Sequence, residues 1–436
     1  MKRPPPLPNP PPQGGRGKSS RRDSPSPLEG EGGEGGARAI EPRTSWLVVW
    51  ALILAGVVAA FQIGKAPVAL PALRAELGLG LVGAGWVVSM FNVLGALAGA
   101  LIGAAGDQIG HRRAVLAGLV LSGAASAIGA AAPDAAVLLA TRFVEGLGFM
   151  ATVTAAPALI ARMARRSDQR LAFGFWSGYM PAGSALMMLA SPPLLAASGW
   201  RGLWLVNAGL MLAAALLVAA ATRGLSRTAA PAARGLAQAV GDILQTLRRP
   251  GPPALALAFG SYTLQYLAVL AFLPTLLVEK DGMSPAGAAA LTALANAANM
   301  LGTFGGGWLS HKGAPRWAMI AAGSLIMGLS SVLIFTPALP FALRYGAVIA
   351  FTLLGGAVPP AVFSGAAQHA PAPELVGTTT GLIMQGSNLG QSIGPPALAK
   401  LAAATGGWRW SPAVLLAAAA TGSALALLLR RLERHG

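Results

Sequence analysis

Apolar runs of about twenty residues, separated by short polar breaks, follow one another from Trp46 almost to the end of the 436-residue chain. A helix rises about 1.5 Å per residue, so a run of this length crosses the roughly 30 Å of hydrocarbon in a bilayer. Barrel strands would alternate polar with apolar residues, and these runs do not. The chain is therefore expected to be an all-α integral membrane protein.

Twelve such runs are expected to cross the membrane as helices, with limits set by the polar breaks between them. They are residues 46–71, 82–105, 114–132, 136–161, 170–197, 201–222, 254–279, 285–309, 316–336, 342–367, 376–402 and 409–430. A basic, proline-containing break at residues 223–253 divides them six and six. We therefore expect a six-helix bundle at residues 46–222, a cytoplasmic linker at 223–253 and a second six-helix bundle at 254–436.

Residues 1–45 differ in composition from the rest of the chain. They contain ten prolines and eight glycines, a mixed charge pattern and almost no aromatic residues. Such a segment cannot bury enough apolar surface to offset the entropy lost on ordering. We expect a disordered cytoplasmic tail. It is not read as a signal peptide, because the apolar run that follows is long enough to span the bilayer.

Lysine and arginine mark one side of the membrane. Eight of them precede the first span, and further groups lie at residues 112–113, 162–170, 223–249, 312–316 and 430–434, in breaks that fall on the same side. An excess of basic residues is typical of cytoplasmic loops. Both termini are therefore expected in the cytoplasm, with the protein in the inner (plasma) membrane.

The two groups of six spans share a weak internal repeat. Gly103, Gly110 and Arg113 recur 203 residues later as Gly306, Gly313 and Arg316. Pro192-Pro193 recurs at the same offset as Pro395-Pro396. Gly199-Trp200-Arg201 recurs 208 residues later as Gly407-Trp408-Arg409. An even number of spans per repeat predicts parallel, pseudo-symmetric halves about an axis along the membrane normal. A transport site is then expected between them.

Composition argues against most other classes of protein. The chain has no cysteine and four widely spaced histidines, so neither a thiol catalyst nor a metal site is expected. No catalytic carboxylate pair and no phosphate-binding loop occur, which argues against an enzyme or ATP-driven transport. The net charge of +17 is spread over short clusters rather than one stripe, so nucleic acid is not an expected partner. We expect no cofactor, and a monomer in the lipid bilayer.

The break after the second span carries the most specific motif, Gly103-Ala-Ala-Gly-Asp107-Gln-Ile-Gly110-His-Arg112-Arg113. It resembles the signature loop of the major facilitator superfamily, with a histidine in place of the first basic residue. The resemblance covers nearly the whole chain after residue 45 and implies secondary transport by alternating access. It also implies that Gly103, Asp107, Gly110, Arg112 and Arg113 form a conformational latch on the cytoplasmic side. The alternative is a loop whose arginines only fix orientation.

The fourth span contains Arg142-Phe-Val-Glu145-Gly146-Leu-Gly148, which resembles a second motif of the superfamily, found mostly in proton-driven members, with glutamate in place of glutamine. Arg142 and Glu145 are three residues apart on one helix face and can pair. Ionisable groups inside a span are candidates for function, so Glu145 and Arg142 are expected to couple transport to protons. The alternative is an ion pair that only sets helix register.

Further polar residues in the spans are candidates for substrate binding. Lys65 either snorkels to the outer headgroups or faces the cavity, where with Arg142 and Glu145 it leaves one positive charge in excess. Tyr262, Gln265 and Tyr266 share one helix face and are expected to contact substrate. The similar stripe at Gln385, Asn388 and Gln391 is expected to join helices, and Asn296 and Asn299 fit either role.

Three functions follow from these features. The first is proton-coupled transport of a small solute, an organic or inorganic anion. The second is efflux of amphipathic drugs by proton antiport, which needs a larger apolar cavity. The third is a membrane sensor that transports nothing, although no additional sensory domain is visible in the sequence.

Overall fold

The computed structural model describes residues 44–223 and 236–435, apart from the side chains at 99–108, 170, 177, 236, 237 and 435. The expected tail at residues 1–45 lies outside the described residues except for its last two. Arg43–Gly436 forms one compact unit.

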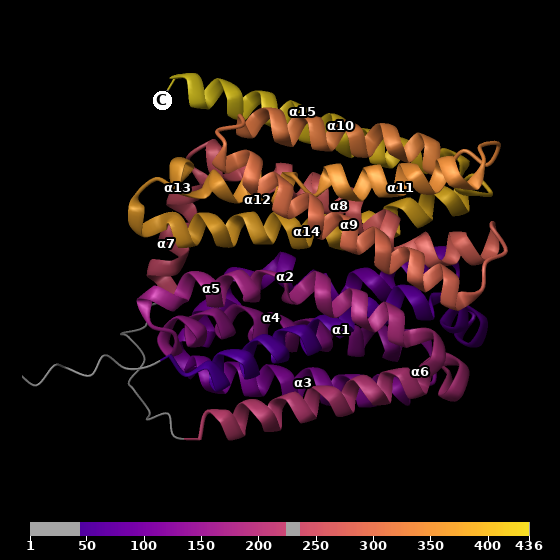
Figure 1. Cartoon of the computed structure of the whole chain (residues 1–436), viewed down its shortest axis with the longest axis horizontal. Coiled ribbons are helices and arrows are strands. Elements are labelled where there is room, and N and C mark those ends of the chain that lie inside the picture. The colour runs from indigo at the N-terminus through magenta and orange to yellow at the C-terminus, as the bar shows by residue number, and fades with distance from the viewer. Residues whose placement is uncertain (1–43, 224–235, 436) are drawn as a thin grey trace, which may run out of the picture. The chain divides into compact units, whose positions relative to one another are not determined.

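Every regular element in the described part of the chain is a helix, as expected (Figure 1). The first six are α1 (Trp46–Leu77), α2 (Leu81–Ile109), α3 (His111–Ala130), α4 (Ala135–Met163), α5 (Arg166–Ser177) and α6 (Tyr179–Ala221). The remainder are α7 (Leu236–Leu247), α8 (Gly251–Glu279), α9 (Pro285–His311), α10 (Arg316–Ile334), α11 (Phe341–Gly355), α12 (Val358–Ser364), α13 (Ala366–His369), α14 (Val376–Ala404) and α15 (Pro412–His435), with short 3-10 turns at Pro373–Leu375 and Trp408–Trp410.

Local chemistry explains where several helices begin and break. The Asp134 carboxylate accepts a hydrogen bond from the Val137 amide and caps α4. Gly199 adopts φ 64° and divides α6 into two parts where a loop was expected. The expected span at 342–367 is three consecutive helices; Pro359 and Pro360 lack amide donors and so interrupt the hydrogen-bond ladder between α11 and α12, and α13 begins after Gly365. The expected linker at 223–253 contains the helix α7, which was not expected from the sequence.

Nine helical segments among the described residues are long and apolar enough to cross a membrane. One of them, Arg166–Ala221, joins two of the expected spans. The helices α9 and α14 are long enough but less apolar, because asparagine, glutamine, serine and threonine interrupt them. Dividing α6 at Gly199 and adding α9 and α14 would give twelve spans, so that number stays a prediction.

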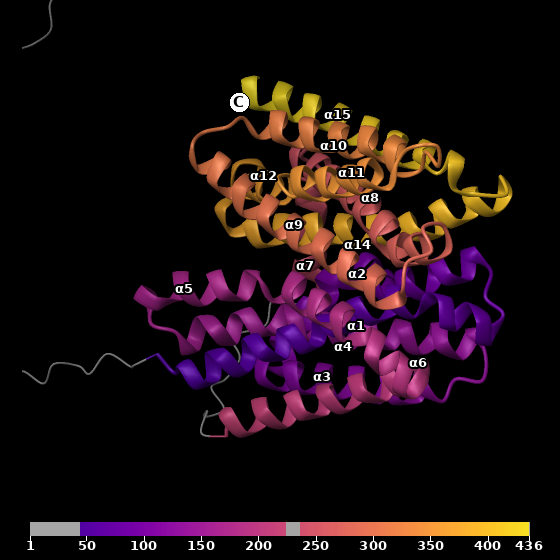
Figure 2. The same ribbon diagram turned by 45° about the vertical axis from the view of Figure 1, so that its right-hand side comes forward.

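Corresponding helices of the two halves begin a nearly constant number of residues apart in the chain. The second helix of each half begins at Leu81 and at Pro285, 204 residues later. The third begins at His111 and at Arg316, 205 residues later. Figures 1 and 2 show α1–α6 together on one side of the unit and α8–α15 on the other. This arrangement is consistent with the expected repeat.

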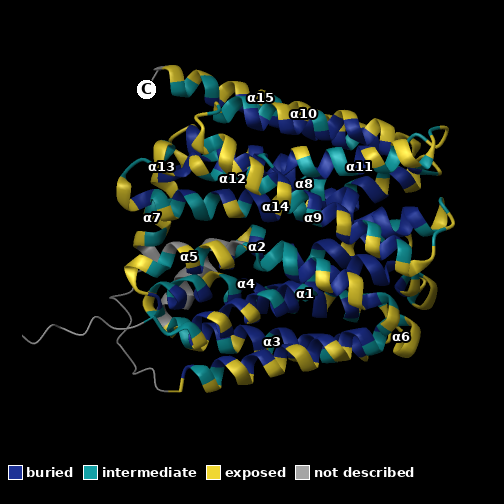
Figure 3. Ribbon diagram, viewed as in Figure 1, coloured by how far each residue is buried: buried dark blue, intermediate teal, exposed yellow. Residues whose placement is uncertain are grey.

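The distribution of polar groups is inverted relative to a water-soluble protein. Large apolar side chains are exposed around the unit, among them Leu97, Leu216 and Leu329, each more than 60% exposed. Lys65, Glu145 and other polar groups are fully buried, and buried residues follow the inner faces of the helices (Figure 3). Lipid takes up an apolar outer surface, whereas polar groups in hydrocarbon must turn inward. Both features confirm the expected membrane protein.

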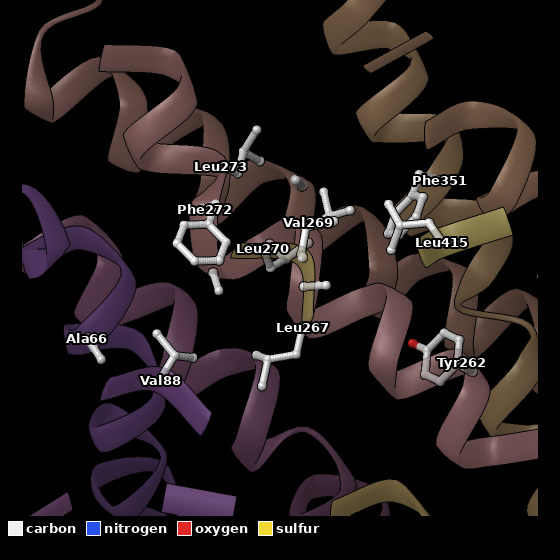
Figure 4. Packing of buried hydrophobic residues seen from close by; sticks show 14 of the residues in the cluster. Ala66, Val88, Tyr262, Leu267, Val269, Leu270, Phe272, Leu273, Phe351 and Leu415 are labelled. Atoms are coloured by element: carbon white, nitrogen blue, oxygen red, sulfur yellow. The ribbon is translucent and has the colours of Figure 1, made fainter. Parts of the chain in front are cut away.

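The two halves meet along α1, α2 and α6 on one side and α8, α9 and α14 on the other. Buried residues of α1 and α2, such as Ala66 and Val88, belong to one apolar cluster with Leu267 and Phe272 of α8 (Figure 4). The Ser89 hydroxyl donates to the Gln391 carbonyl at 3.1 Å. The interface is therefore close-packed where these helices cross.

Candidate functional site

A three-residue ionic cluster lies inside the first half. The Lys65 Nζ of α1 donates to the Glu145 Oε1 of α4 at 2.8 Å. Arg142, also on α4, donates to the other oxygen of the same carboxylate. All three side chains are at most 1% exposed. Counted with Lys65, Arg142 and Glu145 all ionised, the cluster has a formal net charge of +1.

Backbone carbonyls, a hydroxyl and aromatic rings take up the remaining donors of the cluster. Lys65 Nζ also donates to Ser126 Oγ of α3 at 2.8 Å and lies 4.2 Å from the centre of the Trp204 ring. The Arg142 guanidinium donates to the carbonyls of Val87 and Gln62 at 3.0 and 3.1 Å. Cations in a low-dielectric site need such partners, since an unpaired buried charge is very costly.

The glycines of the α4 motif bring the helices close enough to form this site. A Cβ on Gly146 would lie 2.0 Å from the Phe91 carbonyl oxygen of α2. A Cβ on Gly148 would lie 2.4 Å from the Gly118 carbonyl oxygen of α3. Only glycine allows both contacts, so the segment after Glu145 fixes α2 and α3 against α4. The same motif therefore supplies the charges and the packing that encloses them.

The structure places Lys65 inside the first half of the protein. Its ammonium is buried and paired with Glu145, so it does not snorkel to the headgroups. It lies beside Arg142 and Glu145, and that these three residues face a transport cavity stays a prediction. Direct pairing of Lys65 with Glu145 was not foreseen, because the two residues are 80 positions apart and only tertiary packing joins them.

The α8 residues form a separate polar group. Asn299 Nδ2 donates to the Tyr262 hydroxyl at 2.9 Å. The Tyr266 hydroxyl is hydrogen-bonded to Asn296 Oδ1, and Asn296 Nδ2 donates to Ser184 Oγ of α6 at 2.6 Å. The Tyr266–Asn296–Ser184 chain therefore connects the two halves. Its hydrogen bonds do not include Lys65, Arg142 or Glu145.

Part of the expected latch lies outside the described residues. The surroundings of Gly103 and the side chain of Asp107 are not described, although the backbone there belongs to α2. Gly110 has φ 92°, which only glycine adopts readily, and it forms the turn into α3. Arg112 Nε donates to Thr222 Oγ1 at the end of α6, at 2.7 Å, while Arg113 is exposed. The contact of Asp107 that would make a latch is therefore not tested.

Sequence reasoning missed Gln62, which lies one helical turn before Lys65. Its side chain is fully buried, and neither amide atom has a hydrogen-bond partner among the described residues. The internal repeat held the signal, because Gln62 and Gln265 are 203 residues apart, the spacing of the other matched positions. Within the described part of the chain, no group of three or more histidine, aspartate or glutamate residues could hold a metal ion.

The sequence model of the Major Facilitator Superfamily matches residues 52–395. The chain belongs to this superfamily, and it is a multi-pass membrane transporter rather than an enzyme. Two relatives match over short regions. The lincomycin resistance protein of Streptomyces lincolnensis is 31% identical over 29% of this chain, and the puromycin resistance protein pur8 of Streptomyces alboniger is 29% identical over 33%. The matches cover only 26% and 29% of those proteins' own lengths.

Solved structures resemble the chain over most of its length. A bacterial homolog of the human lysosomal transporter Spinster, in an inward-facing and occupied conformation, aligns with a TM-score of 0.74 and 18% identity, over 88% of this chain and 96% of that one. The peptide transporter POT in complex with sulfate aligns with a TM-score of 0.73 and 17% identity, over 89% and 94%. At these identities the likeness establishes the fold.

Proposed function

We propose that this transporter carries a small organic or inorganic anion together with protons, by alternating access between its two halves. The observation that supports the proposal is the buried Lys65–Glu145–Arg142 cluster with its excess positive charge. A site of net positive charge inside a membrane protein favours an anionic substrate. Tyr262, Gln265 and Tyr266 remain candidates for contact with the substrate from the second half.

Proton coupling follows from the shared carboxylate. While Glu145 is ionised, it holds both Lys65 and Arg142. Protonation removes the negative charge, and the two cations are then available to an anion. Proton and anion therefore bind with positive linkage, which favours symport. The proposal gives Glu145 the proton, and Lys65 and Arg142 the anion.

Exchange between conformations would involve contacts that join the halves. The Tyr266–Asn296–Ser184 chain is one of them. The motif residues Gly103, Asp107, Gly110, Arg112 and Arg113 are proposed as a latch of the cytoplasmic side. Asp107→Asn is expected to slow transport without reducing expression, because it weakens a charge-assisted contact made in one state only.

The test separates exchange from coupling in proteoliposomes. Glu145→Gln is expected to retain counterflow exchange of the anion and to lose its acceleration by an imposed pH gradient. Arg142→Ala is expected to abolish both, because the anion loses a main partner. The double variant Lys65→Met/Glu145→Gln keeps the native net charge of the cluster and controls for misfolding of the single variant. Accumulation driven only by protons in Glu145→Gln would refute the coupling role.

Drug efflux by proton antiport is the second candidate. The observation in its favour is that two relatives are named as lincomycin and puromycin resistance proteins, although they match over about a third of this chain or less. A thermal-shift screen of purified protein against small anions and against lincomycin and puromycin separates the two functions. Stabilisation by the antibiotics alone would favour efflux.

We further propose that the protein lies in the inner membrane with both termini in the cytoplasm, on the basis of the one-sided basic clusters. A monomer stays a prediction. Reporter fusions after residues 109, 168 and 240 are all expected to give cytoplasmic signals. A periplasmic signal at 240 would contradict the six-plus-six arrangement of spans.

A further inference from the structure

Gln62 is a buried polar side chain without a structural explanation. It is 0% exposed, and neither its Nε2 nor its Oε1 has a partner among the described residues. Native proteins retain few such groups, because burial of an unsatisfied amide costs free energy that a hydrogen bond would recover. A residue of this kind is expected to find its partner in a ligand or in another state of the protein.

Gln265 has the same character in the second half. It is 0% exposed, its Nε2 donates to the Ser261 carbonyl at 3.3 Å, and its Oε1 has no partner among the described residues. A carbonyl only accepts hydrogen bonds, so the amide orientation of Gln265 is set by Ser261. The unsatisfied atom of Gln265 is therefore an acceptor, and it needs a donor.

The two glutamines occupy equivalent positions in the first helix of each half. Pro71 of α1 and Pro274 of α8 are also 203 residues apart, and both line one cleft between the halves. Gln62 and Gln265 each lie nine residues before their proline, which is about 13 Å along either helix. Each glutamine therefore lies at the same height along the first helix of its half, about two and a half turns before the proline that lines the cleft.

The surroundings of both residues connect them to the interface and to the ionic cluster. Ala66, one turn after Gln62, belongs to the same apolar cluster as Leu267, two residues after Gln265 (Figure 4). Lys65 lies one turn from Gln62, and Arg142 donates to the Gln62 carbonyl. The excess positive charge thus lies beside one glutamine of the pair.

We propose that Gln62 and Gln265 are a substrate-binding pair, one from each half, and that the transported anion carries an N–H or O–H donor. Gln62 Nε2 would donate to an anionic oxygen near Lys65 and Arg142, and Gln265 Oε1 would accept from the donor of the same molecule. Carboxylates with a hydroxyl or amino group, and hydrogencarbonate, have this chemistry. The inference rests on the anion transport proposed above and adds to it the substrate class and Gln62.

The first experiment needs no substrate and measures the Tm of purified, unliganded variants. Gln62→Met and Gln265→Met replace the amide by an apolar chain of similar size. If the amides are kept for a ligand, each variant is expected to raise the Tm by about 2 °C, because a buried unsatisfied group is removed. Gln391→Met is the control, because Gln391 Nε2 already donates to Ser387 Oγ at 3.1 Å, and its Tm is expected to stay equal or fall. A lower Tm in both test variants would overturn the proposal.

The second experiment compares anions that differ in a donor. Glycolate is set against acetate, lactate against propionate, and hydrogencarbonate against nitrate, each by its thermal shift of the purified protein. In at least one pair, only the first anion, which carries the donor, is expected to stabilise the wild type. Gln62→Met and Gln265→Met are expected to weaken the binding of that anion at least tenfold. Gln391→Met is expected to bind it as the wild type does. Equal stabilisation by both members, or binding unchanged in the test variants, would overturn the proposal.

The two experiments also separate this inference from the proposed function. If no anion stabilises any variant, the proposed anion preference fails, and the unliganded Tm values still decide whether the glutamines serve a ligand. If anions bind but proton-driven accumulation survives in Glu145→Gln, proton coupling through Glu145 fails while the glutamine pair stands.

Discussion

The stability of the ionic cluster is expected to depend on its charge balance more than on any one contact. The Lys65–Glu145 distance of 2.8 Å corresponds to a direct attraction of about 6 kcal/mol at an effective dielectric constant of about 20. Glu145→Gln removes this attraction and that of Arg142, and it leaves two buried cations side by side. Loss of one partner of a buried pair costs about 3–5 kcal/mol, so this variant is expected to be strongly destabilised.

Lys65→Met has a different expected result. It leaves the Arg142–Glu145 pair neutral, and an apolar side chain of similar length fills the space, which is often nearly neutral for stability. Lys65→Met/Glu145→Gln leaves Arg142 alone, with the same net charge as the native cluster. The double variant is therefore expected to be more stable than Glu145→Gln, although it carries one substitution more.

Equilibrium unfolding of the four proteins in detergent gives the coupling energy between the two positions. We expect a coupling of at least about 1.5 kcal/mol, because the two side chains are in direct contact. If the two single losses add to the loss of the double variant within about 0.5 kcal/mol, charge balance does not govern the cluster and the reasoning is wrong.

Two further predictions concern packing and the interface between the halves. Gly302→Ala is expected to lower the Tm or prevent folding, because the added Cβ would lie 1.8 Å from the Leu353 carbonyl oxygen of α11. Gly305→Ala is the control and is expected to fold normally, because a Cβ added there would meet no atom within 4 Å. Arg74→Glu is expected to change the Tm little, because the Arg74–Glu279 pair is partly exposed and worth about 1 kcal/mol or less. It is nevertheless expected to favour separation of α1 from α8, measured as faster labelling of a single cysteine introduced at that end of α8 in each protein, and Arg74→Glu/Glu279→Arg should restore the native rate. Equal labelling in the three proteins would contradict a gating role.

The sequence by itself determined the membrane class, the helical state and the superfamily, because runs of about twenty apolar residues and the spaced glycines and arginines are local signals. It also paired Arg142 with Glu145, since residues three apart on a helix share a face. Helix breaks at Gly178 and at Pro359–Pro360, and the helix α7, depended on backbone hydrogen bonding that apolar runs do not report.

Only the tertiary structure decided how the polar residues combine. Lys65 could reach either the headgroups or the interior from its position on α1, and the packing of α4 against α1 placed its ammonium on Glu145. Asn296, which is hydrogen-bonded to Tyr266, gained a partner on the opposite half, Ser184, which lies 112 residues away from it. The side-chain amide of Gln62 gained no partner among the described residues. Such outcomes depend on distances between helices, and helix periodicity specifies which face a residue occupies but not what that face meets.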